Sequence, residues 1–521
     1  MPTLNWIGKE AVLNHDKEVP FRLLRKIKNG SNGDSSQNLI IHGDNLEALK
    51  AIMPYYYGKI KCIYIDPPYN TGNEKWVYND KVNSPKIKKW LGKVVGGESE
   101  DLCRHDKWLC MMYPRLKLLR ELLSEDGVIF VSIDDNEHCN LKHAFDEIFG
   151  EINFIGSFIW RKKEGGGQTV EYFVKEHEYI MAFRKSEKFE WKDEITSDDE
   201  TKFKKSDEKG KYASVKLAKW GNTARKEDRP SMHFPIVAPD KSKVYPVAPD
   251  GSEGRWRVGK ERMDELVKNN FIEWQKKNEA WIPYEKVYFS EDKSKIIKVR
   301  SILYDVGNTA DASKTLTELF EVKDKFDTPK PVNLIKFLIK HSTNEDSLIL
   351  DSFAGSGTTG HAVLDLNKED GGDRKFILIE VEDHVVKDIT AERIKRAIKK
   401  HDYKDGFEYC ELDKPLFNEE GQIEEDCTFE QLATYIYFTE TQTNIDKKRI
   451  AGNLVGDNET KEIYLIYKEK NNNILDKSFL KKLNRNNLKK IIYADKCLLS
   501  KDILSKYNIQ FKQIPYEVEV Y

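Results

Sequence analysis

Two sets of residues with chemical potential follow apolar segments that are far apart in the chain. The first set is Asp66, Pro67, Pro68 and Tyr69, directly after the mostly apolar segment 60–65. Such a segment before prolines is typical of a buried strand that ends in a rigid turn. An exocyclic amine could donate its two hydrogens to the Asp66 carboxylate and the Pro67 carbonyl, which proline holds in place. Tyr69 could stack on a base that has left its helix.

The second set is a turn with two glycines that follows the apolar segment 348–350 and contains Asp351, Phe353, Gly355 and Gly357. Glycines leave room for a ligand, and the amides at the start of the next helix attract negative groups. Glu380 ends the following apolar segment, where an acid can accept hydrogen bonds from two ribose hydroxyls. The GxGxxG and GxxxxGK[ST] patterns are absent, so the turn favours a smaller adenosyl ligand over a dinucleotide and does not indicate an ATPase.

Each motif alone has a plainer interpretation. The first could be a polyproline turn with a surface tyrosine, and the second a turn that needs glycine for steric reasons. Gly43-Asp44, after the segment 38–42, is by itself most often the cap of a helix. Together the first two motifs favour transfer of a methyl group to a base in nucleic acid.

Other polar pairs are weaker candidates. Asp134 and Asp135 follow a buried segment, but adjacent residues on an extended chain point to opposite faces, so a capping role is expected there. His105 stands at the start of a predicted helix and is not assigned to catalysis. No spacing of cysteine or histidine indicates a metal site, and none is predicted.

Short apolar segments alternate with helical patterns in two stretches of the chain, which predicts a parallel α/β sheet. This alternation is lost between 161 and 325. We therefore predict one α/β domain made of residues 1–160 and 326–404, a target-recognition insert at 161–325, and a small α/β domain at 405–521. Predicted strands include 38–42, 60–65, 127–133, 177–183, 348–350, 376–380, 463–467, 490–493 and 510–521, and predicted helices 45–53, 108–123, 331–340 and 386–400.

Composition indicates a soluble protein. About a third of the 521 residues are charged, the net charge is −2, and mean hydropathy is negative. Residues 200–230 hold ten lysines and arginines against five acidic residues, with three aromatics among them, which suits a nucleic-acid surface. The seven cysteines lack paired spacing, and no signal peptide or membrane span is recognised. A reduced, cytoplasmic protein is expected.

The motifs resemble those of β-group amino-methyltransferases of DNA. The resemblance rests on residues 43–46, 66–73 and 353–359. Residues 73–80 and 104–116 are more narrowly similar to modification subunits of type III restriction–modification systems. The resemblance implies a Rossmann-like methyltransferase domain that uses S-adenosylmethionine. The catalytic motif would come before the cofactor motif, which is a circularly permuted order, and a target-recognition domain would lie between them.

The resemblance also implies an activity and residue roles. The activity would be methylation of adenine N6 in double-stranded DNA, with Asp66 to Tyr69 as the catalytic motif. Asp351, Phe353, Gly355 and Gly357 would surround the methionine part of the cofactor, Glu380 would bind its ribose, and Asp44 its adenine. Lys330-Pro331 stands where the family has a further motif on the cofactor side.

Partners are implied as well. Members of this family form homodimers, to which the C-terminal domain could contribute, and can join a separate restriction subunit with helicase and nuclease motifs. A solitary methyltransferase remains an alternative. So does methylation of cytosine N4, although such enzymes more often have serine in the position of Asp66. A non-catalytic specificity subunit and methylation of RNA or of a protein amide are further alternatives that the intact motifs and the long insert disfavour.

Overall fold

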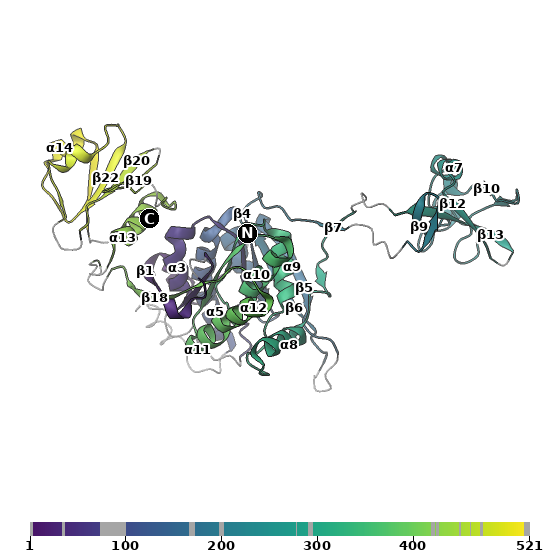
Figure 1. The fold of residues 1–521 in the computed structure, drawn as a ribbon, viewed down its shortest axis with the longest axis horizontal. Coiled ribbons are helices and arrows are strands. Elements are labelled where there is room, and N and C mark those ends of the chain that lie inside the picture. The colour runs from purple at the N-terminus through teal and green to yellow at the C-terminus, as the bar shows by residue number, and fades with distance from the viewer. Residues whose placement is uncertain are drawn as a thin grey trace. The chain divides into compact units, whose positions relative to one another are not determined.

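The protein consists of two compact units, one formed by Met1–Lys192 with Arg300–Tyr521 and the other by Asp193–Val299. Figure 1 shows the elements of both units. The computed structural model describes residues 4–33, 37–72, 101–165, 172–196, 203–277, 279–289, 295–417, 423, 427–446, 450–458, 460–468 and 473–514.

The larger unit is built on a ten-stranded sheet (Figure 1). Its strands in spatial order are β1 (Arg22–Lys26), β18 (Glu408–Pro415), β2 (Leu39–His42), β17 (Lys375–Glu380), β16 (Leu348–Asp351), β3 (Ile60–Ile65), β4 (Leu123–Ile133), β6 (His177–Arg184), β5 (Phe154–Arg161) and β15 (Ile302–Leu303). The run from β18 to β4 is parallel, and β6 is antiparallel to β4. The central parallel sheet predicted from the alternating pattern is therefore confirmed.

Helices cover both faces of this sheet because successive strand residues point to opposite sides. Ile63 and Ile65 belong to one hydrophobic cluster, whereas Cys62 and Tyr64 belong to the other. The first cluster includes residues of α3 (Asn45–Tyr56), α5 (Asp101–Leu122) and α6 (His138–Phe149). The second includes residues of α8 (Thr309–Phe320), α9 (Val332–Ser342), α10 (Thr358–Asp370) and α12 (Glu392–His401). The result is a three-layer, Rossmann-like α/β fold, as predicted.

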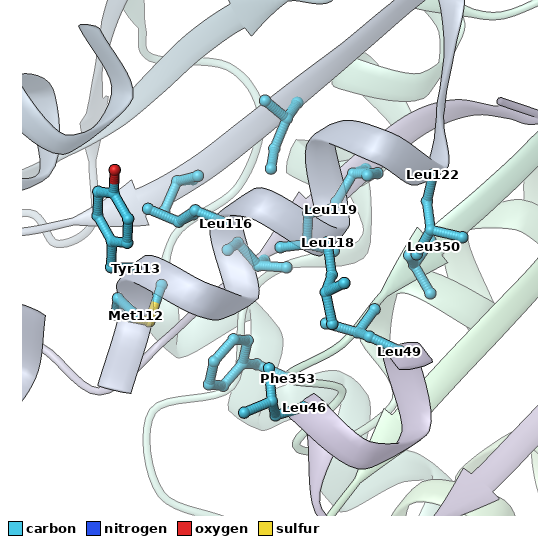
Figure 2. Packing of buried hydrophobic residues seen from close by; sticks show 14 of the residues in the cluster. Leu46, Leu49, Met112, Tyr113, Leu116, Leu118, Leu119, Leu122, Leu350 and Phe353 are labelled. Carbon is cyan, nitrogen blue, oxygen red and sulfur yellow. The ribbon is translucent and has the colours of Figure 1, made fainter. Parts of the chain in front are cut away.

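One part of the first cluster joins the two halves of this fold (Figure 2). Leu46 and Leu49 of α3 pack with a row of apolar residues on α5, and Leu350 of β16 lies in the same cluster. Phe353, from the glycine turn, lies beside Leu46 (Figure 2) and is 5% exposed. Residues more than 200 positions apart are thus held in one core.

The predicted insert at 161–325 is too long. Its first part belongs to the larger unit because β6 pairs with both β4 and β5, and its last part because β15 pairs with β5 and α8 packs in the second cluster. The compact inserted unit is Asp193–Val299. The predicted helix 386–400 is also divided, into α11 (Asp383–Val385), a π-helix at Val386–Ala391 and α12.

The inserted unit has its own sheet and core. The sheet order is β12 (Ile272–Lys277), β13 (Ala280–Tyr288), β9 (Gly210–Lys216) and β8 (Lys205–Asp207). Trp256 is fully buried in a cluster that includes Met263 and Leu266 of α7 (Lys260–Lys268). Smaller pairings in this unit join β10 (Ile236–Val237) to β11 (Lys243–Val244) and β7 (Glu194–Thr196) to β14 (Lys295–Ile297).

The C-terminal part forms a second, four-stranded sheet. Its order is β19 (Leu454–Asp457), β20 (Lys461–Leu465), β22 (Lys489–Ala494) and β24 (Ile509–Gln513), with α13 (Phe429–Thr441) before it and α14 (Lys501–Lys506) before β24. The predicted boundary at 405 is early, because β18 belongs to the ten-stranded sheet. The predicted strand at 510–521 lies partly outside the described residues. Residues 73–80 lie wholly outside them. Within the described part of the chain, no helix is long and apolar enough to cross a membrane.

Candidate active site

The two predicted motifs meet at one edge of the large sheet. β3 and β16 are parallel neighbours, with Cys62 opposite Ile349 and Ile63 opposite Leu350. Asp66 therefore follows β3 at the same edge at which Asp351 ends β16. This edge, at the carboxyl ends of parallel strands, is where open α/β sheets bind ligands.

The turn after β3 is fixed by contacts from other elements. Trp108 of α5 donates from Nε1 to the carbonyl oxygen of Pro68 at 2.7 Å. Asn70, which is fully buried, has a left-handed φ of 59° and donates to the Glu137 carboxylate. Glu137 also lies 2.6 Å from Nδ1 of His105. His105 thus supports the turn through Glu137, and Pro67 is buried within it.

Asp66 is held by a cluster of charged and aromatic groups. Lys330 donates from Nζ to Asp66 Oδ2 at 2.6 Å, and the hydroxyl of Tyr69 lies 2.8 Å from Asp66 Oδ1. The same hydroxyl is 3.1 Å from Glu178 Oε2, so its single hydrogen is shared between two carboxylates. Lys162 donates to Glu178 Oε1 at 2.8 Å. Both Asp66 oxygens therefore have partners in the free protein.

The charges in this cluster stabilise one another. Burial alone would lower the pKa of Lys330, but Asp66 and Glu178 outweigh it and raise that pKa above its usual value. Burial likewise opposes ionisation of Glu178, yet Lys330 and Lys162 hold its pKa below the usual value. Burial and the two carboxylates raise the pKa of Tyr69 well above its usual value. These shifts favour the ammonium form of Lys330, the carboxylate form of Glu178 and the neutral phenol of Tyr69.

The glycine turn after β16 is ordered by Asp351. Its Oδ1 accepts a hydrogen bond from the backbone nitrogen of Phe353 at 3.0 Å, and its Oδ2 from the hydroxyl of Thr359 at 2.5 Å. Burial raises the pKa of Asp351 to about 7 against these two bonds, and the nearby charges of Asp66 and Glu380 add to the increase. A cation placed beside these acids would be strongly favoured.

Both glycines of this turn are required by the backbone. Gly355 has φ +48° and Gly357 has φ +77°, a region that residues with a Cβ rarely adopt. A Cβ on Gly355 would lie 3.2 Å from the ring of Phe326, and one on Gly357 would lie 3.2 Å from Thr390. The turn thus brings bare backbone close to the sheet edge.

Glu380, at the end of β17, fixes the same turn. Its Oε2 accepts from the backbone nitrogen of Gly355 at 2.8 Å, and its Oε1 from those of Val381 at 2.8 Å and Glu382 at 3.1 Å. Burial raises its pKa despite these three donors. A carboxylate offers about four acceptor positions, so capacity for one further hydrogen bond remains.

Asp44 caps helix α3, which is the plainer role considered for it. Its Oδ1 accepts from the backbone nitrogen of Leu46 at 2.9 Å, and Arg115 of α5 donates to Oδ2 at 3.1 Å. Asp44 also follows β2, beside β17, so it lies at the same sheet edge as Glu380. Its carboxylate is 9% exposed.

Sequence reasoning missed Glu178, Lys162 and Trp108. Glu178 stands near the start of β6, which is antiparallel to β4, so it comes to the edge at which the parallel strands end. An acid at the start of an antiparallel strand beside a parallel sheet is the signal that could have found it. Asp134, by contrast, accepts from the backbone nitrogen of Asn136 at 2.9 Å, a capping contact as expected. The described residues contain no group of three potential metal ligands.

Comparison with known proteins identifies the family. Residues 60–392 match the model of a family described as "DNA methylase". The chain is 34% identical over 448 residues to the Mod subunit of the type III restriction–modification enzyme EcoPI from Escherichia phage P1, covering 76% of this chain and 68% of that protein. It is 31% identical to the EcoP15I Mod subunit from Escherichia coli, with 77% and 69% covered.

Other similarities are consistent with this family. The type II methyltransferase M.KpnI from Klebsiella pneumoniae is 36% identical over 369 residues, covering 68% of this chain and 83% of that protein. Among solved structures, a putative DNA modification methylase from Thermus thermophilus complexed with S-adenosyl-L-methionine is 13% identical, with a TM-score of 0.33 over 72% of this chain and all of that one.

The predicted resemblance and enzyme class are confirmed. Each of the two halves of the large sheet supplies one of the motifs within the matched region. The chain belongs to the DNA methylase family and is a DNA methyltransferase.

Proposed function

We propose that this protein methylates N6 of an adenine flipped out of double-stranded DNA, as the modification subunit of a type III restriction–modification system. The observation that carries the proposal is the placement of Asp66 and the glycine turn on adjacent parallel strands, at one sheet edge. Similarity to two type III Mod subunits supports the choice of system. Aspartate at position 66, rather than serine, supports adenine over cytosine.

The glycine turn has the features expected of the cofactor site. Gly355 and Gly357 bring backbone without a Cβ to this sheet edge, where a Cβ would crowd Phe326 or Thr390, and the hydroxyl of Ser352 is buried with no hydrogen-bond partner among the described residues. Asp351 and Glu380 make the site acidic, which suits the cationic S-adenosylmethionine. When bound, S-adenosylmethionine supplies an electrophilic methyl group on a sulfonium. We assign the methionine part to Asp351, Phe353 and the two glycines, the ribose to Glu380, and the adenine to the region of Asp44.

The residues after β3 would prepare the target amine. Asp66 and the Pro67 carbonyl can accept its two hydrogens, which draws the nitrogen toward tetrahedral geometry. Once it takes up the methyl group, the nitrogen would be cationic, and its proton could pass to Asp66 or to water. Lys330 keeps negative charge localised on Asp66 before this step. For a base to reach Asp66 Oδ1, the hydroxyl of Tyr69 must exchange this acceptor for Glu178, which is already 3.1 Å away.

An assay of acceptor class tests the proposal. Purified protein is incubated with cofactor labelled in the methyl group and with duplex DNA, RNA or a protein mixture in separate reactions. The proposal predicts label in duplex DNA only, and with Asp66→Asn at most about a hundredth of the wild-type rate of labelling. Transfer to RNA or protein with DNA unlabelled would contradict it, and so would full transfer by Asp66→Asn.

We further propose that Asp193–Val299 selects the DNA sequence, that the protein forms a homodimer and that it can join a separate restriction subunit. The basic stretch 200–230 supports a DNA contact in the inserted unit. The type III Mod relatives support the two protein partners. Light scattering after size-exclusion chromatography should give twice the chain mass of 60.7 kDa, and a monomer at micromolar concentration would contradict the homodimer.

A further inference from the structure

A chain of hydrogen bonds connects the cofactor turn to Asp66. The hydroxyl of Thr358, the first residue of α10, donates to the backbone carbonyl of Lys330 at 3.2 Å. The side chain of Lys330 in turn donates to Asp66 Oδ2 at 2.6 Å. Arg393 of α12 donates from Nη1 to the Thr358 hydroxyl at 2.7 Å. Three side chains thus lead from α12 to the catalytic carboxylate.

Arg393, where this series of hydrogen bonds begins, is unusual because its guanidinium is buried without a carboxylate partner among the described residues. It is 0% exposed, and no carboxylate pairs with it in the described part of the protein. Its Nη1 also donates to Ser356, to the hydroxyl at 2.9 Å and to the backbone carbonyl at 3.2 Å, whereas Nε and Nη2 have no partner among the described residues. Burial lowers its pKa to about 9. Burying a guanidinium without a counter-ion is costly, so its remaining contacts with the turn matter.

The backbone of Lys330 is restricted by its sequence neighbour as well as by Thr358. Pro331 follows it and begins the entry into α9, which restricts Lys330 to extended backbone. The Lys330 ammonium lies 5.2 Å from the ring centre of Tyr69 and 5.9 Å from that of Trp160, in a space that is closed to solvent. The hydrogen bond from Thr358 therefore helps to fix the Lys330 backbone, and with it the position at which the Lys330 ammonium meets Asp66.

We propose that Thr358 and Arg393 are positioning residues, which hold the Lys330 backbone so that its ammonium aligns Asp66 for methyl transfer. The inference rests on the proposed function, because it assigns Asp66 to the target amine. It couples the cofactor turn to the catalytic motif, which belong to different strands. Neither residue needs to touch the base.

The test compares Thr358→Val, which removes the hydroxyl, with Thr358→Ser, which keeps it. Single-turnover methyl transfer is measured with saturating cofactor and DNA, so that weaker cofactor binding does not lower the rate. Thr358→Val should be about tenfold to a hundredfold slower, because small misplacements of reacting groups cost this much, and Thr358→Ser should be within about threefold of wild type. If Thr358→Val is recovered unfolded, Thr358→Ala takes its place with the same expectation.

Thr343→Val is the matched control. Thr343 is fully buried, donates to the carbonyl of Ile339 at 2.8 Å and accepts from buried Arg374 at 3.1 Å, but it precedes β16 and is distant from the site in the sheet. This variant should lose stability and keep the wild-type rate. An equal loss of rate in Thr343→Val, or no recovery in Thr358→Ser, would overturn the proposal.

Measuring Thr358→Val in a protein that also lacks the Lys330 ammonium shows whether Thr358 acts through Lys330. In Lys330→Met, which lacks the ammonium, Thr358→Val should slow transfer less than about twofold, because coupled residues are not additive. An undiminished effect in that background would also overturn the proposal. If the wild-type protein transfers no methyl group to DNA, the proposed function fails; if it does and Thr358→Val matches it, only the positioning role fails.

Discussion

At the scale of single residues, the chemistry depends on one carboxylate that is held from both sides. Asp66 has Lys330 on one oxygen and Tyr69 on the other. Asp66→Asn keeps the shape and removes the charge. We expect the transfer rate to fall by about a hundredfold to ten-thousandfold, the usual contribution of a group that takes up a proton. Cofactor affinity should remain, because Asp66 has no hydrogen bond to the glycine turn in the described contacts.

A neighbouring aspartate provides the control for this variant. Asp134 follows β4, the strand beside β3, and caps a turn. Asp134→Asn should therefore keep the wild-type transfer rate and cofactor affinity. Rate constants from quenched-flow experiments and affinities from calorimetry separate the two effects. Full activity of Asp66→Asn would remove this carboxylate from the mechanism.

Asp351 predicts a pH dependence of cofactor binding. Its pKa in the folded protein is raised from 3.8 to about 7, so the free protein resists ionisation of this group. A cationic ligand favours the ionised form, and affinity should therefore rise as pH increases through about 7, by roughly tenfold between about pH 6 and about pH 8. Asp351→Asn should lack this dependence, and an unchanged profile in that variant would contradict the assignment.

The raised pKa of Asp351 also makes the stability of the folded protein depend on pH. Because the folded protein binds this proton more tightly than the unfolded chain, the contribution of Asp351 to stability falls as pH rises from about 4 to about 7 and is constant above that. Thermal unfolding of wild type and Asp351→Asn across this range, without cofactor, measures the difference. A wild-type curve that gained stability relative to the variant with rising pH would contradict the sign.

The site residues differ in how readily the sequence predicts them. Asp66 and the glycine turn follow apolar segments that read as buried strands, so their placement at strand ends could be predicted. The Lys330–Asp66 pair and the Tyr69–Glu178 contact could not, because each depends on which strands are neighbours and in which direction they run. Lys330 was noted only through the resemblance, and nothing in its local sequence indicates a carboxylate partner.

At the scale of elements, helix α10 offers a direct test of the glycine turn. Gly357 stands at its N-terminal end with φ +77°, and Gly371 at its C-terminal end with φ +74°. A Cβ on Gly357 would meet Thr390 at 3.2 Å, whereas one on Gly371 meets nothing within 4 Å. Both alanine variants should lose about 1–2 kcal/mol of stability, because alanine is strained in the left-handed conformation that both glycines adopt. Only Gly357→Ala should also lose cofactor affinity.

Calorimetric titration with S-adenosylmethionine and thermal unfolding of both variants separate strain from steric exclusion. Equal cofactor affinity in Gly357→Ala and Gly371→Ala would show that the turn after β16 has a structural role only. The expected result is a clear loss of affinity in Gly357→Ala at matched fractions of folded protein.

The central parallel strands of the large sheet could be predicted, but the placement of the outer strands beyond β4 could not. Parallel strands between helices give long apolar runs, which is why β3, β4, β16 and β17 were recognised. The pattern predicts a strand at 177–183, but the loss of helical alternation places it within the predicted insert, whereas β6 continues the large sheet as an antiparallel strand. β15 is only two residues long, too short for any sequence pattern.

At the scale of the whole molecule, the inserted unit should carry sequence selection. Asp193–Val299 is compact, with its own core around Trp256, so it can be exchanged as a unit. Replacing residues 193–299 with the corresponding part of a type III Mod relative should change the DNA sequence that is methylated and leave the methylated atom the same. Sequencing that detects modified bases reads both. Unchanged sites after the exchange would place selection elsewhere.

The whole account depends on one chemical outcome, which a single measurement can read. The purified protein is incubated with S-adenosylmethionine and unmodified duplex DNA, the DNA is digested to nucleosides, and the products are separated and identified by mass. N6-methyldeoxyadenosine is expected with wild-type protein, and at most about a hundredth as much after the same time with Asp66→Asn. N4-methyldeoxycytidine, or no methylated nucleoside from a protein that binds both cofactor and DNA, would contradict it.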